Sequence, residues 1–83
     1  MTQQDVIAGI DVSKDRLDVC LWPTGETMAF ANDPAGCARL ARRLAGRAVT
    51  AVALEASGGY EREAMAALRA AGLRLHRLNG HCQ

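Results

Sequence analysis

Two apolar runs that each end in a single acid constrain the fold of this chain most strongly. Residues 6–11 read VIAGID and residues 49–55 read VTAVALE, and a turn of small residues follows each acid. A short and nearly continuous apolar run is typical of a strand that is covered on both faces of a sheet. Open α/β sheets carry their ligand sites at the carboxyl edge of such strands. The pattern therefore places Asp11 and Glu55 at an edge where chemistry takes place.

The rest of the chain divides into short segments with clear periodicity. Residues 16–22 alternate between apolar and polar side chains, which predicts a half-buried strand. Asp33 and Pro34 predict the start of a helix, because Asp caps a helix and Pro suits its first position. The expected elements are strands at 5–12, at 16–22 and around Met28 and Phe30, a helix that ends at Gly46, a strand at 48–54, a helix that opens at Ser57 or Gly58 and ends at Gly72, and a strand with Leu73, Leu75 and Leu78.

The order β-β-β-α-β-α-β predicts the fold class. It is the start of an α/β, ribonuclease-H-like mixed sheet with the strand order 3-2-1-4-5. In this order the first and fourth strands are parallel neighbours, so Asp11 and Glu55 face each other across one strand spacing of about 4.8 Å. Right-handed crossovers place both helices on the same face of the sheet. The other face is then expected to be uncovered and apolar, which predicts self-association or poor solubility.

Charge is distributed unevenly along the 83 residues, although the formal net charge is only +1. Residues 1–33 carry six acids against two bases, and residues 34–83 carry eight arginines against three acids. The basic half suits a polyanion such as a nucleic-acid backbone, or it is a solvated helix face. Three widely spaced cysteines favour neither a zinc site nor a disulfide framework, and no apolar run approaches the length of a membrane span.

Asp11 and Glu55 allow two interpretations. Two carboxylates are the usual start of a site for Mg²⁺, which also takes waters and substrate phosphates as ligands. Alternatively, Asp11 caps a turn and Glu55 interacts with the amino end of the second helix. The spacing by itself does not separate these interpretations.

Other polar residues are weaker candidates for contact with a nucleic-acid backbone. Lys14 follows the first acid, Gly58 would let a phosphate approach the second turn, and Ser57 fits a helix cap better than a nucleophile. Each of these residues also has a purely structural interpretation, as a solvated lysine, a turn glycine or a cap. The arginine candidates on the first helix are Arg39, Arg42 and Arg43.

Four motifs in the right order resemble one known family. They are residues 9–14 (GIDVSK), 17–19 (LDV), 30–33 (FAND) and 54–61 (LEASGGYE). Together they closely resemble the amino-terminal part of DEDD-type, RuvC-like insertion-sequence transposases, the insertion sequence 110 family that includes the Piv-type invertases. The resemblance implies four catalytic acids, Asp, Glu, Asp and Asp, that bind Mg²⁺. Asp11 and Glu55 match the first two acids.

The resemblance also implies what this chain does and lacks. We expect residues 1–83 to be a single incomplete RuvC-like domain, without the last two acids or the separate domain that carries a catalytic serine. At residues 79–83 the sequence departs from the Asn-Pro of the family. The expected partners are DNA at element ends and target, an RNA, and a second copy or a full-length transposase, with no membrane and a bacterial cytoplasmic location.

The parent family carries out DNA transposition and recombination, and we expect the fragment to be inactive alone. Two alternatives remain open. One is an actin-like or sugar-kinase-type nucleotide-binding lobe, although the turn after Asp11 is poor in glycine. The other is a non-catalytic remnant that binds DNA or an intact transposase.

Overall fold

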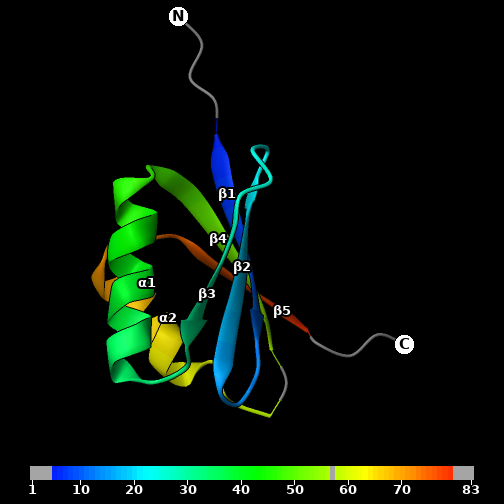
Figure 1. Cartoon of the computed structure of the whole chain (residues 1–83), viewed down its shortest axis with the longest axis vertical. Coiled ribbons are helices and arrows are strands. Elements are labelled where there is room, and N and C mark those ends of the chain that lie inside the picture. Colours follow the sequence, from blue (N-terminus) through cyan, green and yellow to red (C-terminus); the bar gives the residue numbers. More distant parts are fainter. Residues whose placement is uncertain (1–4, 57, 80–83) are drawn as a thin grey trace, which may run out of the picture.

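The computed structural model describes residues 5–56 and 58–79 as one five-stranded sheet with two helices. The strands and helices follow one another in the predicted order (Figure 1). They are β1 (Val6–Val12), β2 (Arg16–Trp22), β3 (Thr27–Ala31), α1 (Pro34–Gly46), β4 (Val49–Ala56), α2 (Arg62–Ala70) and β5 (Leu75–Asn79).

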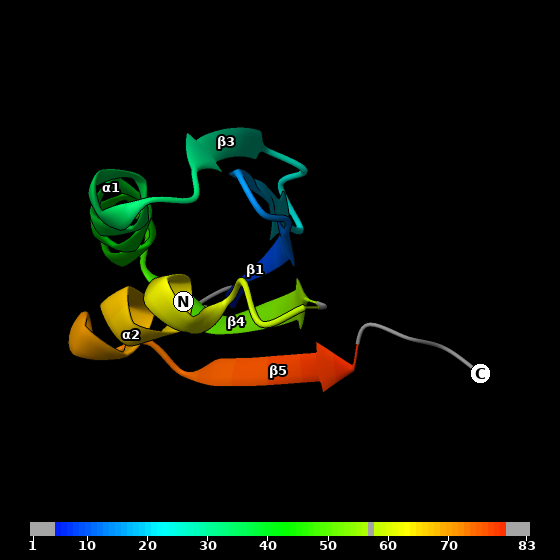
Figure 2. The ribbon, with the colours of Figure 1, turned by 90° about the horizontal axis from the view of Figure 1, so that it is seen from below.

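The sheet has the order β3-β2-β1-β4-β5, which confirms the predicted fold class. Strands β1, β2 and β3 form an antiparallel meander, and β1, β4 and β5 run parallel to one another. Both helices lie on the same side of the sheet, as the handedness of the crossovers requires (Figure 2). We call this side the helix face and the opposite side the open face.

Alternation along the strands assigns each side chain to one face. On β2, Leu17, Val19 and Leu21 are buried, whereas the four residues between and beside them are exposed. The buried set belongs to the helix face, where it packs with Leu40 and Leu44 of α1. The hydrophobic core is therefore a single layer between the sheet and the two helices.

Helix α1 begins as predicted and packs tightly against the end of β3. The Asp33 carboxylate accepts a hydrogen bond from the backbone N–H of Gly36 at 2.6 Å, and Pro34 occupies the first turn. Gly36 is buried, and a Cβ at this position would collide with the backbone carbonyl of Ala31. Glycine at position 36 is therefore what allows α1 to lie this close to the sheet.

Helix α2 begins later than predicted, which is a correction. It starts at Arg62 with Glu61 as its N-cap residue, not at Ser57 or Gly58. Gly58 and Gly59 have φ angles of 82° and 80°, and this left-handed backbone cannot enter a right-handed helix directly. The predicted cap at Ser57 lies outside the described residues. Leu73, expected in the fifth strand, precedes β5 and packs partly buried against the core.

Candidate metal centre at the carboxyl end of the sheet

Asp11 and Glu55 are direct neighbours in the sheet. Asp11 is the last residue but one of β1, Glu55 is the last residue but one of β4, and the two are register partners in the parallel pair. Their neighbours Ile10 and Leu54 are buried on the helix face, so both acids are exposed on the open face. The sequence prediction that one strand spacing separates these acids is confirmed.

A third carboxylate, which was not predicted from the sequence, joins this row. Asp18 of β2 is the register partner of Asp11 and is exposed on the same face. Asp18, Asp11 and Glu55 thus follow one another across β2, β1 and β4. The polar alternation of residues 16–22 contained part of this signal, but the pairing depends on the length of the turn between β1 and β2.

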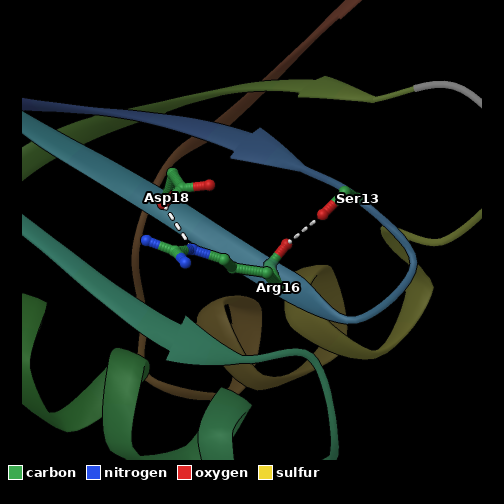
Figure 3. A network of polar contacts seen from close by, with 3 residues as sticks. All are labelled: Ser13, Arg16 and Asp18. Atoms are coloured by element: carbon green, nitrogen blue, oxygen red, sulfur yellow. Dashed lines mark hydrogen bonds and ion pairs between the residues drawn. The ribbon is translucent and has the colours of Figure 1, made fainter.

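Arg16 partly compensates the charge of Asp18. Its Nε atom lies 2.8 Å from the Asp18 carboxylate, and the two side chains point toward each other from the same face of β2 (Figure 3). Both side chains are at least half exposed, so the ion pair contributes only about 0–1 kcal/mol to stability. The pair nevertheless makes Asp18 electrostatically different from the two acids beside it.

The turn after Asp11 is closed by Ser13 and not by Asp11. The backbone N–H and the Oγ–H of Ser13 both donate to the Arg16 carbonyl, each at 3.0 Å (Figure 3). Helix α2 lies on the helix face, with Glu61 as its N-cap residue and Glu63 as the acid of its first turn, whereas Glu55 is exposed on the open face. Ser13 therefore closes the turn that Asp11 was considered to cap.

The donor chemistry at this position suits a hard divalent cation only in part. Carboxylate oxygens are the protein ligands that Mg²⁺ prefers, and Asp11 and Glu55 present them side by side. Within residues 5–56 and 58–79, no group of three or more His, Cys, Asp or Glu side chains is placed to hold one metal ion. Asp11 and Glu55 therefore fit as two members of a larger ligand set.

The acids border a hollow of about 630 Å³ in the open face. Gly9 of β1, Ala29 of β3 and Ala53 of β4 line it and leave the backbone accessible. Leu78 of β5 also lines the hollow and is 49% exposed. The small apolar residues that made β1 and β4 look covered on both faces therefore produce a depression with acids along one side.

The remaining predicted residues lie in two separate places. Lys14 is exposed in the turn after β1, and Gly58 is exposed in the turn after β4, so both are at the same end of the sheet as the acids. Ser57 lies outside the described residues.

The arginines lie elsewhere. Arg39, Arg42 and Arg43 of α1 line a second hollow of about 480 Å³ together with Phe30 and Arg47. Helix α1 packs on the helix face, so the structure does not bring these arginines to the acids (Figure 2). Arg47 pairs with Glu26, which leaves the other three arginines as the basic part of this hollow.

Neither of the two cysteines in the described part of the chain belongs to the row of acids. Burial raises the pKa of the Cys37 thiol above its usual value of 9.0, and the negative charges of Glu63 and Asp33 raise it further. The thiol therefore stays protonated at neutral pH and acts as a core side chain. Cys20 is exposed on the open face and lines the larger hollow.

Strand order, helix placement and paired acids define a ribonuclease-H-like domain of the RuvC type. Among solved structures, the chain resembles T. thermophilus RuvC in complex with a Holliday junction substrate, with a TM-score of 0.67 and 17% sequence identity. The match covers 92% of this chain and 65% of the RuvC chain, so this chain spans slightly less than two thirds of it. At this level of identity the likeness establishes the fold.

The family follows from the sequence match. A family model described as transposase, of the DEDD type of insertion sequence 110, matches residues 8–82. The chain belongs to this transposase family, which confirms the resemblance drawn from the four motifs. No curated protein matches the chain. No helix within residues 5–56 and 58–79 is long and apolar enough to cross a membrane.

Proposed function

We propose that this chain is the amino-terminal part of the catalytic domain of a DNA transposase and supplies the first two of four metal-binding acids. The observation that carries the proposal is the pairing of Asp11 with Glu55 on parallel neighbours, with both carboxylates exposed on the open face. Membership of a DEDD transposase family and the RuvC-like fold support it. The proposed substrate is DNA at element ends and target sites.

The divalent ion, proposed to be Mg²⁺, would be held by Asp11 and Glu55 together with acids from outside this chain. Such an ion neutralises phosphate charge and activates the attacking oxygen in phosphodiester chemistry. The residues of this chain would fix the position of the two carboxylates. Without a cation, the row formed by Asp18, Asp11 and Glu55 repels a phosphodiester backbone, so DNA contact at this edge would depend on the metal.

The chain alone is proposed to be inactive. Two carboxylates rarely suffice for the two-ion chemistry of phosphodiester cleavage. The proposed domain assignment is that residues 1–83 form one incomplete RuvC-like domain, which needs the acids of a following segment. We therefore expect metal binding without DNA cleavage.

A second nucleic-acid contact is proposed at the arginine hollow on α1. Arg39, Arg42 and Arg43 line one depression beside Phe30, and three guanidinium groups suit two or three phosphates. Because α1 covers the helix face, this contact would hold a segment of nucleic acid away from the acids, with DNA or an RNA as the partner. Lys14 and Gly58, at the same end of the sheet as the acids, are the proposed contacts with the nucleic-acid backbone there.

Association with a second copy or with a full-length transposase is proposed through the open face. Trp22 is 65% exposed and Ile7 is 37% exposed, and these two residues are register partners on β2 and β1. Exposed apolar neighbours of this size are a frequent basis of protein association. With DNA as its partner, the chain would act in the bacterial cytoplasm.

A chimera tests the catalytic proposal. Residues 8–79 of this chain would replace the equivalent segment of a full-length family transposase, and Mg²⁺-dependent cleavage of element-end DNA would be measured. We expect the chimera to cleave DNA and the 83-residue chain to leave DNA intact. Asp11→Asn or Glu55→Gln in the chimera should lower the cleavage rate about 10²–10³-fold, the order expected when a transition-state contact is lost.

Asp15→Asn is the matched control, because Asp15 is an exposed acid in the turn after β1 outside the row. It should leave cleavage within about twofold of the unmodified chimera. Cleavage by the isolated chain, or full activity of the Asp11→Asn chimera, would refute the proposal. ATP binding by the isolated chain with no affinity for Mg²⁺ or DNA would instead favour the nucleotide-binding lobe.

A further inference from the structure

We infer that Asn32 is a positioning residue that sets the distance between Asp11 and Glu55. The inference rests on the proposed metal centre and concerns a residue outside it. Asn32 follows β3, whereas the two acids lie on β1 and β4. It acts through the backbone of the turns that follow those two strands.

The side chain and the backbone N–H of Asn32 have partners in three parts of the chain. Its side-chain N–H₂ group donates to the Ser13 carbonyl at 2.8 Å and to the Tyr60 carbonyl at 3.0 Å. Its backbone N–H donates to the Asp15 carbonyl at 3.0 Å, and its Oδ1 atom lies 3.7 Å from the Cys37 thiol. Both partners of the side-chain nitrogen are acceptors only, which fixes the orientation of the amide.

The two carbonyls belong to the turns that carry the acids. Ser13 lies two residues after Asp11, and Tyr60 lies five residues after Glu55. The β1–β4 ladder ends one pair beyond the acids, at Val12 and Ala56. The ladder stops at that pair. Beyond it, the two hydrogen bonds of the Asn32 side chain connect the turn after β1 with the turn after β4.

The acids need such a connection for a physical reason. Asp11 and Glu55 repel each other before a cation binds, and they lie almost at the end of their strands. The turn after β4 contains Gly58 and Gly59 in left-handed conformations, and glycine backbone adapts easily to a push. Groups that orient metal ligands from outside the ligand set typically affect affinity by about 10–100-fold.

Affinity for Mn²⁺, measured on the full 83-residue chain by electron paramagnetic resonance, tests the inference. Asn32→Ala removes both donors, and Asn32→Asp keeps the shape of the side chain while removing them. We expect each variant to weaken Mn²⁺ binding about tenfold. Circular dichroism would set a temperature at which all variants are folded, so that the comparison concerns the native state.

Thr50→Val is the matched control. The Thr50 hydroxyl donates to the Val6 carbonyl at 3.1 Å and also joins β4 to β1, but at their amino ends. Its loss should change Mn²⁺ affinity less than twofold. Equal weakening by Thr50→Val and the Asn32 variants, or unchanged affinity in folded Asn32 variants, would overturn the inference.

Two further measurements separate this inference from the proposed function. Asp11→Asn and Glu55→Gln should abolish the Mn²⁺ site, and unchanged binding in both would refute the metal centre itself. If neither Asn32 variant folds, nitrogen-15 NMR of the unaltered chain decides. The Asn32 side-chain N–H₂ signals should then shift with Mg²⁺ at the same midpoint as the amides of Asp11 and Glu55, and a constant signal would contradict the inference.

Discussion

The helix face and the open face of the sheet are built from alternate residues of the same strands, yet one carries the hydrophobic core and the other carries exposed acids. Leu54 and Glu55 are adjacent in β4, and one is fully buried under the helices while the other is exposed. Ile10 and Asp11 show the same contrast in β1. Stability is therefore concentrated on one face, and the acids of the proposed metal centre are on the other.

This division means that the acids do not compete with the core. A shift by one residue in either strand would bury a carboxylate and expose a core side chain. Ile10 and Val12 flank Asp11, and both are buried. Their burial fixes the register of β1 and therefore the position of the Asp11 carboxylate. The hydrophobic pattern thereby determines where the charges lie.

The largest expected effect comes from comparing substitutions at two adjacent residues of β4 that lie on opposite faces of the sheet. Leu54→Ala should lower the free energy of unfolding by about 2–5 kcal/mol, because Leu54 is fully buried. Glu55→Gln should change it by less than about 0.5 kcal/mol, as is usual for exposed sites. Urea unfolding followed by circular dichroism measures both. Similar losses of unfolding free energy in the two variants would contradict the conclusion that stability is concentrated on the helix face.

A smaller effect is expected where α1 meets the sheet. Gly36→Ala should lower the free energy of unfolding by about 1–3 kcal/mol, because the new Cβ would lie 2.8 Å from the Ala31 carbonyl carbon. Gly46→Ala, at the end of the same helix, meets no atom within 4 Å and should be neutral or slightly stabilising. Thermal unfolding compares them, and a neutral Gly36→Ala would show that α1 can move away from β3.

The smallest effect is expected on the open face. Trp22→Lys should weaken self-association at least tenfold, or about 1.4 kcal/mol, by placing a charge in the apolar patch. Tyr60→Lys is the control, since Tyr60 is 46% exposed but lies in the turn between β4 and α2. Analytical ultracentrifugation provides the measurement. A strictly monomeric unmodified chain would contradict the role of this face in association.

The fold was predictable from sequence because its signals are local. Acid-terminated apolar runs, the alternation in residues 16–22 and the Asp33-Pro34 helix start each depend on a few neighbouring residues, and handedness supplied the placement of the helices. The predicted start of α2 was wrong because Ser57, a residue type that often caps helices, precedes two glycines. The left-handed backbone of these glycines delays the helix until Arg62.

The site was predictable only in part. Asp11 and Glu55 followed from strand order, but Asp18 depends on the exact register of the first hairpin. Asn32 was visible only as part of a family motif, because its partners at Ser13 and Tyr60 are 19 and 28 residues away. Contacts at this separation come from the three-dimensional arrangement and leave no periodic signal in the chain.

Asp11 and Glu55 are proposed to bind the same divalent ion, and a double-mutant cycle measures whether they do. Mg²⁺ affinity would be measured by NMR titration for the unmodified chain, Asp11→Asn, Glu55→Gln and the double variant. For one shared ion, each single change should remove most of the affinity, and the second change should add little. Independent, additive losses, or a single variant that binds Mg²⁺ as tightly as the unmodified chain, would contradict the claim.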